Sequence, residues 1–221
     1  MNNSRDVTGL QFLLLVAMPF GIALAVVAFL FVGCQQKQQA ETPKAIVSIE
    51  NLRTAYGKSV QRHTMYSKFA TNADRERMKN AASLFRAVAR SEEIHAALHA
   101  ALLRKTRVEP VTPVEDSVTV GTTFQTLKMA MSCEQLEFQS MYPNLIRTAE
   151  LEVYPEAAEQ FRLVKEADAR HYELFKGAYD LAGRIQKVPY LVCPQCGYVL
   201  TSEQTEECPV CHAKKQQFER I

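Results

Sequence analysis

The chain has 221 residues, of which 47% are hydrophobic, so it can form one or two compact domains with a substantial core. Lysine and arginine number 26 and aspartate and glutamate 24, which gives a formal charge of +2. This balance excludes the strongly basic surface typical of nucleic-acid-binding domains, so we expect no nucleic-acid partner.

The first feature along the chain is an apolar stretch from Phe12 to Gly33 without a charged residue. As a helix it is long enough to cross a hydrocarbon core of about 30 Å. It also exceeds the roughly 7 to 15 apolar residues of a cleaved signal peptide. Gly33-Cys34 resembles the end of a bacterial lipoprotein signal, which makes Cys34 a candidate for lipidation. Residues 1–34 therefore predict a membrane anchor or a lipoprotein signal, with the soluble part outside the cytoplasm.

Residues 35–45 form a polar linker, and the pattern after it predicts a mainly α protein built on an antiparallel four-helix bundle. The alanine- and leucine-rich run AALHAALL strongly favours helix in the second of these segments. Pro143 is expected to end or kink the third, and Gly183 to stop the fourth. The expected helices run over about Ile49–Asn72, Asp74–Lys105, Thr122–Tyr142 and Pro155–Leu181.

Three of these helices carry pairs of metal-binding side chains spaced three residues apart, which places both members on one helical face. The pairs are Glu92 with His95, Glu134 with Glu137, and Asp168 with His171. A bundle that binds two metal ions draws a carboxylate from each of two helices and a Glu-x-x-His pair from each of the others. One such pair alone is more often a solvated helix face, but the order of all three predicts a metal site inside the bundle.

The C-terminal segment holds two Cys-x-x-Cys motifs, formed by Cys193 with Cys196 and by Cys208 with Cys211. Each short turn directs both sulfurs inward, so four thiolates surround one tetrahedral metal ion. Both iron and zinc accept this arrangement. A metal site in the bundle could receive electrons from the four-cysteine site, which favours iron over zinc at the cysteines.

Together these features resemble the rubrerythrin family from about Ile49 to Ile221. The resemblance extends to the run Asn51 to Tyr56, to His63 and Tyr66, to Met141-Tyr142-Pro143 and to the closing Phe218-Glu219. It implies a ferritin-like di-iron domain over residues 46–184 and a small rubredoxin-like domain over residues 185–221.

The resemblance also implies an activity, namely reduction of hydrogen peroxide at the di-iron site. Electrons would return from the iron of the four cysteines, which needs an outside reductant that the sequence does not identify. A homodimer is implied, because in relatives the rubredoxin-like domain of one chain serves its partner's di-iron site. Tyr66 and Tyr142 would be hydroxyl donors near the metals, although ordinary packing explains them equally well. The implied ligands in the bundle are Glu92, His95, Glu134, Glu137, Asp168 and His171.

Two positions depart from the family pattern. The glutamate ligand of the first helix falls on Ser59, or on Lys58 if one gap is allowed, and neither is a carboxylate. His63 is a candidate substitute ligand, and Asp168 stands where the family has glutamate. Two alternatives to the enzyme follow: a non-enzymatic iron-binding or electron-transfer protein with a degraded di-iron site, and an interaction protein with a zinc ribbon.

Overall fold

The structure is a computed structural model that describes residues 45–113, 119–182, 184–201 and 205–221. The apolar stretch from Phe12 to Gly33, Cys34 and the expected stop at Gly183 lie outside these residues. Among the helices of the described residues, none combines the length and the apolar character needed to span a membrane.

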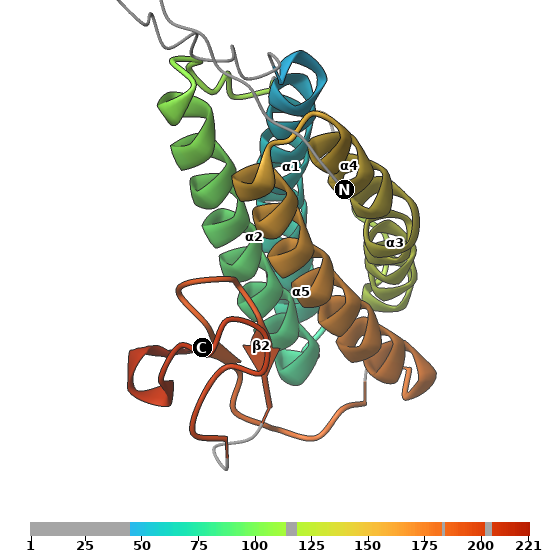
Figure 1. Cartoon of the computed structure of the whole chain (residues 1–221). Helices are drawn as coiled ribbons and strands as arrows, with labels where there is room; N and C mark the ends of the chain where they lie inside the picture. The colour runs from blue at the N-terminus through green and yellow to red at the C-terminus, as the bar shows by residue number, and fades with distance from the viewer. Residues whose placement is uncertain (1–44, 114–118, 183, 202–204) are drawn as a thin grey trace, which may run out of the picture. The chain divides into compact units, whose positions relative to one another are not determined.

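Long helices dominate the described residues, which confirms the expected helical bundle (Figure 1). Helix α1 packs along α2, while α5 packs against α3 and α4. The bounds are α1 Ile46–Arg75, α2 Lys79–Lys105, α3 Thr123–Leu136, α4 Tyr142–Leu151 and α5 Pro155–Asp180.

The first turn of the bundle lies later than the sequence predicted. Helix α1 continues through Asp74, and the chain reverses over residues 76–78, where Arg77 has a φ of 63°. A left-handed backbone angle is uncommon for a residue such as arginine. With no glycine or proline at the reversal, the sequence carried no local signal for it.

The third predicted helix does not end at Pro143. Helix α3 begins with a capping box between Thr122 and Gln125, passes into a π-helix over Glu137–Met141, and continues as α4. Pro143 lies in the first turn of α4 and has no N–H for the carbonyl four residues earlier. The wider π turn falls on that stretch, so the helical path continues past the proline.

The C-terminal segment forms a three-stranded antiparallel sheet in the order β2-β1-β3. The strands are β1 Leu191–Val192, β2 Val199–Leu200 and β3 Glu219–Arg220, and a 3₁₀ turn covers Lys215–Gln217. Leu191 pairs with Leu200 on one side and with Arg220 on the other. This confirms a small C-terminal domain after the bundle, and its β1 and β2 contact α2.

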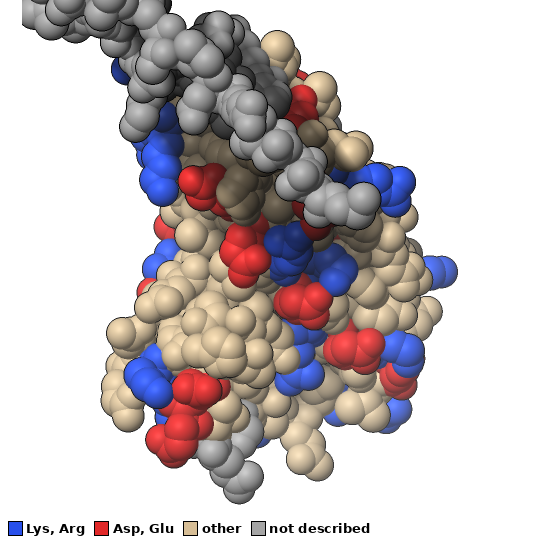
Figure 2. All heavy atoms as spheres, viewed as in Figure 1, with Lys and Arg blue, Asp and Glu red and all other residues tan. Residues whose placement is uncertain are grey.

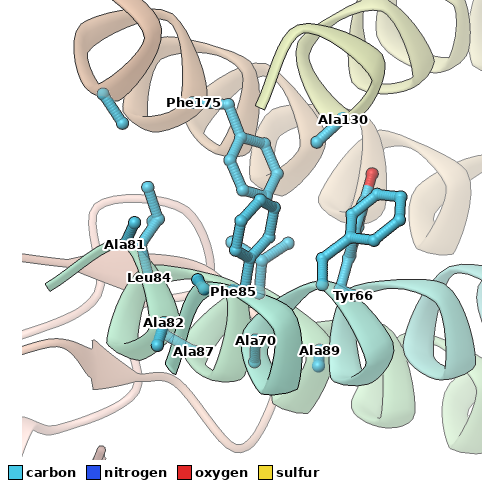
Figure 3. Packing of buried hydrophobic residues seen from close by; sticks show 14 of the residues in the cluster. Tyr66, Ala70, Ala81, Ala82, Leu84, Phe85, Ala87, Ala89, Ala130 and Phe175 are labelled. Carbon is cyan, nitrogen blue, oxygen red and sulfur yellow. The ribbon is translucent and has the colours of Figure 1, made fainter. Parts of the chain in front are cut away.

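Aromatic packing joins α1, α2 and α5 in the core of the bundle. Phe85 of α2 and Phe175 of α5 reach toward one another, with ring centroids 5.3 Å apart (Figure 3). Tyr66 of α1 packs on Phe175 at 5.2 Å. The same buried cluster includes Tyr190, Val192 and Val199, so the small sheet shares a core with the bundle. On the face shown in Figure 2, positive and negative side chains are interspersed.

Candidate metal centres

Four buried side chains from three helices converge inside the bundle. Each offers a ligand atom, and these atoms all lie within 4.8 Å of one another. Glu92 comes from α2, Glu134 from α3, and Asp168 and His171 from α5. Burying three carboxylates together is costly unless a cation compensates their charge. The cluster therefore has the geometry and the charge of a metal site.

Unpartnered polar atoms point to the same conclusion. Glu92 Oε1, both carboxylate oxygens of Asp168, His95 Nδ1 and His171 Nε2 are buried without a hydrogen-bond partner among the described residues. His95 Nδ1 lies 3.5 Å from both Glu92 Oε2 and Asp168 Oδ1, so His95 faces the cluster. Buried polar atoms are normally satisfied, and carboxylates with imidazoles are suitable ligands for iron. The residues present thus fit a bound metal, including the shorter Asp168.

Burial sets the protonation of the cluster in the metal-free chain. Burial and the neighbouring Glu92 raise the pKa of Glu134 to about 8. The pKa of Asp168 is raised well above its usual range by burial and by the carboxylate of Glu134. Burial lowers the pKa of His171 to about 4, which keeps its imidazole neutral and able to bind a metal. Metal uptake must therefore release protons from the carboxyl groups.

Both predicted tyrosines are fully buried next to this cluster. The Tyr66 hydroxyl donates a short hydrogen bond to Glu134 Oε1. The Tyr142 hydroxyl lies 3.3 Å from His99 Nε2, and the Gln160 side-chain amide lies 2.8 Å from His99 Nδ1. Burial raises the pKa of both phenols, assisted by Glu134 at Tyr66 and by Asp168 at Tyr142. Both hydroxyl groups therefore remain protonated donors.

The α1 side of the site differs from the rest. Ser59 is buried but carries no carboxylate, and His63 Nδ1 is 2.9 Å from the Ala89 carbonyl oxygen rather than in the cluster. Glu137 is paired with Arg62 of α1, with Arg62 Nη2 2.7 Å from Glu137 Oε1. Burial raises the pKa of Glu137 to about 8, with Arg62 opposing the shift. On this side of the site, α1 therefore contributes the Arg62 guanidinium group, which is paired with Glu137.

The four cysteines of the C-terminal domain form the second centre. Their sulfurs lie within 4.8 Å of one another, with Cys193 and Cys211 at 3.5 Å and Cys196 and Cys208 also at 3.5 Å. A tetrahedral site with metal–sulfur bonds of about 2.3 Å needs sulfurs about 3.8 Å apart. The sulfurs are therefore already close to coordinating positions.

The two centres meet at α2. His95, whose Nδ1 faces the carboxylates, places its Nε2 3.1 Å from the backbone oxygen of Cys196. One turn earlier, the Ser91 hydroxyl donates a 2.5 Å hydrogen bond to the Gly197 carbonyl. Arg90 adds two 2.7 Å hydrogen bonds to the two carboxylate oxygens of Glu219. A single imidazole thus connects a cysteine ligand with the carboxylate cluster.

Sequence reasoning missed several of these contacts. His99 follows His95 by four residues and therefore shares its helical face, a signal that was available. Arg62 follows Ser59 by three residues, and its role shows only when Glu137 is placed opposite it. The contacts of Ser91 with Gly197 join residues far apart in sequence, and no local pattern indicates them.

Comparison with known proteins agrees with this arrangement. Residues 50–179 match the family model described as rubrerythrin, and residues 192–219 match the rubredoxin-like domain of rubrerythrin. Rubrerythrin-2 of Clostridium acetobutylicum is 31% identical over 185 residues, covering 80% of this chain and 97% of that protein. Nigerythrin of Nitratidesulfovibrio vulgaris is 30% identical over 180 residues, covering 81% and 89%.

A solved structure of nigerythrin in a mixed-valence state superposes with a TM-score of 0.74 at 30% identity, covering 79% of this chain and 86% of that one. The two family models together match the helical bundle and the small domain that carries the four cysteines. The chain therefore belongs to the rubrerythrin family, with a di-iron site in its bundle and an iron site at its four cysteines.

Proposed function

We propose that this protein is a non-haem di-iron oxidoreductase that reduces hydrogen peroxide with electrons supplied through its four-cysteine iron. The observation that carries the proposal is the position of His95. Its Nδ1 lies 3.5 Å from Glu92 and Asp168, and its Nε2 lies 3.1 Å from the carbonyl oxygen of Cys196. Through these contacts the imidazole provides a short route for electrons from the thiolate centre to the carboxylate cluster.

The reaction consumes one hydrogen peroxide, two electrons and two protons, breaks the oxygen–oxygen bond and yields two water molecules. Reduced iron, when bound in the bundle, would supply the two electrons. Glu92, Glu134, Asp168, His95 and His171 would hold that metal, and all five side chains are buried from bulk water. Their burial strengthens every charge interaction at the reacting centre.

The tyrosines position protons at this site. The Tyr66 hydroxyl donates to Glu134 Oε1 and so fixes the orientation of that carboxylate. The Gln160 side-chain amide donates to His99 Nδ1, which leaves the proton of the imidazole on Nε2, directed at the Tyr142 oxygen. The hydrogen of the Tyr142 hydroxyl is then free to point toward the cluster. Tyr142 is thus a neutral donor for the oxygen atoms of the substrate, while Tyr66 directs its proton to Glu134.

The rubredoxin-like domain delivers the electrons one at a time. Ser91, His95 and Arg90 hold it against α2 by hydrogen bonds to Gly197, Cys196 and Glu219. These contacts lie within one chain and support a route that needs no second subunit. The dimeric arrangement implied by the family resemblance is the alternative, and a complementation experiment described below separates the two.

We also propose that the N-terminal apolar stretch, Phe12 to Gly33, attaches the protein to a membrane and leaves its metal domains outside the cytoplasm. The support is the length of that stretch and its lack of charge. Mass spectrometry of the intact protein tests the lipoprotein form, because a chain lipidated at Cys34 has lost residues 1–33. Recovery of the chain in the soluble fraction would contradict both forms of attachment.

The proposed activity is tested by mixing the anaerobically reduced, iron-loaded protein with hydrogen peroxide in a stopped-flow instrument. We expect the absorbance of the oxidised four-cysteine iron to appear quickly, and peroxide to be consumed over many turnovers when a reductant is supplied. Glu92→Gln should abolish turnover. Glu93→Gln, an exposed neighbour on the same helix, should preserve it. Peroxide consumption no faster than that of the Glu92→Gln chain would contradict the proposal.

Two observations favour a second candidate, a protein that only binds iron and transfers electrons. The missing carboxylate at Ser59 and the pairing of Glu137 with Arg62 both remove a ligand from the second metal position. In that case the reduced four-cysteine iron would exchange electrons with a carrier, but peroxide would not oxidise it at a catalytic rate. The same stopped-flow experiment therefore distinguishes the two functions.

A further inference from the structure

A largely buried ion pair joins Arg62 and Glu137 inside the bundle. Arg62 extends from α1, one turn beyond Ser59, and contacts Glu137 at 2.7 Å. Only 13% of the Arg62 side chain and 4% of the Glu137 side chain are exposed. Both groups are therefore largely removed from water, where a charge pair is screened far less than at the surface.

We propose that Arg62 competes with the second metal ion for Glu137, so that the two metal positions of the bundle fill with unequal affinity. The first position is made by Glu92, Glu134, Asp168 and His171, whose ligand atoms already lie within 4.8 Å of one another. Glu137 is outside this group and is held by the guanidinium. The proposal concerns metal occupancy and does not depend on peroxide being the substrate.

The charge of Arg62 explains why the competition is strong. A guanidinium group stays protonated at any physiological pH, so Arg62 always presents a positive charge to Glu137. A metal ion bound by Glu137 would lie beside that charge and be repelled, while no carboxylate at Ser59 offsets the repulsion. The second ion therefore binds Glu137 only when Arg62 moves away.

The surroundings of Arg62 allow such a movement. Arg62 and Glu137 line a pocket of about 260 Å³ together with Lys58, Ser140 and Asn144. Arg62 Nε has no hydrogen-bond partner among the described residues, so one end of the guanidinium is not fixed. The pocket offers the side chain space away from Glu137. We infer that the Arg62 side chain is a displaceable positive charge at the second metal position.

Manganese titration tests this inference without relying on activity. The full-length protein, with zinc already bound at the four cysteines, is titrated anaerobically with Mn²⁺ and followed by electron paramagnetic resonance. A single bound ion gives an isolated spectrum, and a pair gives an exchange-coupled one. We expect two well-separated dissociation constants in the unaltered chain.

Arg62→Met should tighten the second ion about ten- to a hundredfold, the size expected when a charged hydrogen-bonding competitor is removed. The dissociation constant of the first ion should change much less. Arg62→Lys keeps the charge and should retain the separation of the two constants. Arg62→Gln is a second neutral variant that can still hydrogen-bond Glu137, and it should shift the second constant in the same direction as Arg62→Met.

A double-mutant cycle tests whether Glu137 is the carboxylate for which Arg62 and the second metal ion compete. In the Glu137→Gln background, Arg62→Met should tighten binding of the second ion much less than in the unaltered chain, because only the repulsion by the guanidinium charge is relieved and no carboxylate is released. Equal tightening of both ions, or an unchanged second constant in both neutral variants, would overturn the inference. Binding of no Mn²⁺ in the bundle would overturn it as well.

Discussion

Replacing Gly197 with alanine should separate the two metal centres, because this glycine lies where the cysteine motif touches α2. Its φ of 77° belongs to the left-handed region, in which a side chain is strained. A β-carbon added there would lie 2.5 Å from His95 Nε2 and 2.8 Å from His95 Cδ2, and closer still to the Ser91 hydroxyl. The motif must therefore move away from the helix.

The magnitude follows from what that movement breaks. The left-handed conformation costs an alanine about 1–2 kcal/mol. Loss of the bonds from Ser91 to the Gly197 carbonyl and from His95 to the Cys196 carbonyl removes about 0.5–1.5 kcal/mol each. That strain stays in the undocked motif, so the two lost hydrogen bonds set the change in docking, about 1–3 kcal/mol, which lowers the docking equilibrium constant at least about fivefold.

The assay is the stopped-flow oxidation of the reduced four-cysteine iron by peroxide. We expect Gly197→Ala to slow this step at least about fivefold, while the visible spectrum and the iron content of the cysteine site are preserved. Gly177→Ala is the matched control, because a β-carbon at this α5 position meets nothing within 4 Å. An unchanged oxidation rate in a Gly197→Ala chain with intact iron would refute the proposed contact.

Three further predictions concern the bundle and the pairing of the domains. In the metal-free chain, the melting temperature should fall as the pH rises from about 6.5 to 8, because folded Glu134, whose pKa is about 8, keeps a proton that the unfolded chain has lost. A melting temperature that does not change with pH would contradict the burial of this carboxyl. His99→Leu leaves the Gln160 amide and the Tyr142 hydroxyl without their buried partner, so urea denaturation should show a loss of about 1–3 kcal/mol. A smaller loss than that of His63→Leu, which breaks one hydrogen bond in a half-buried position, would argue against this network. If electrons pass within one chain, mixing Cys196→Ser protein with Glu92→Gln protein should restore no peroxide turnover, whereas recovery would show that the cysteine domain serves a partner chain.

The bundle and its metal-binding residues could be predicted because their signals are local. A spacing of three residues places Glu92 with His95, and Asp168 with His171, on single helix faces. The structure brings Glu92, Glu134, Asp168 and His171 together in one cluster. Two short Cys-x-x-Cys motifs likewise determine the cysteine site, because each fixes two sulfurs within one turn.

The contacts between distant segments could not be predicted in this way. Arg62 opposes Glu137 because α1 packs beside the π-helical turn, and neither that turn nor its side-chain directions follow from spacing. The π-helix also changed the expected effect of Pro143, which was predicted to end or kink the third helix. His63 was a candidate ligand by its place in the sequence, but its hydrogen bond to the Ala89 carbonyl directs it elsewhere.

Mössbauer spectroscopy of the chain after anaerobic loading with ⁵⁷Fe tests the central claim most directly, because it counts thiolate-bound and carboxylate-bound iron separately. We expect a ferrous signal typical of four sulfur ligands together with a second one typical of oxygen and nitrogen ligands. Brief exposure to peroxide should convert both to ferric iron. A spectrum with sulfur-bound iron alone, and no iron in the bundle at saturating metal, would contradict the account.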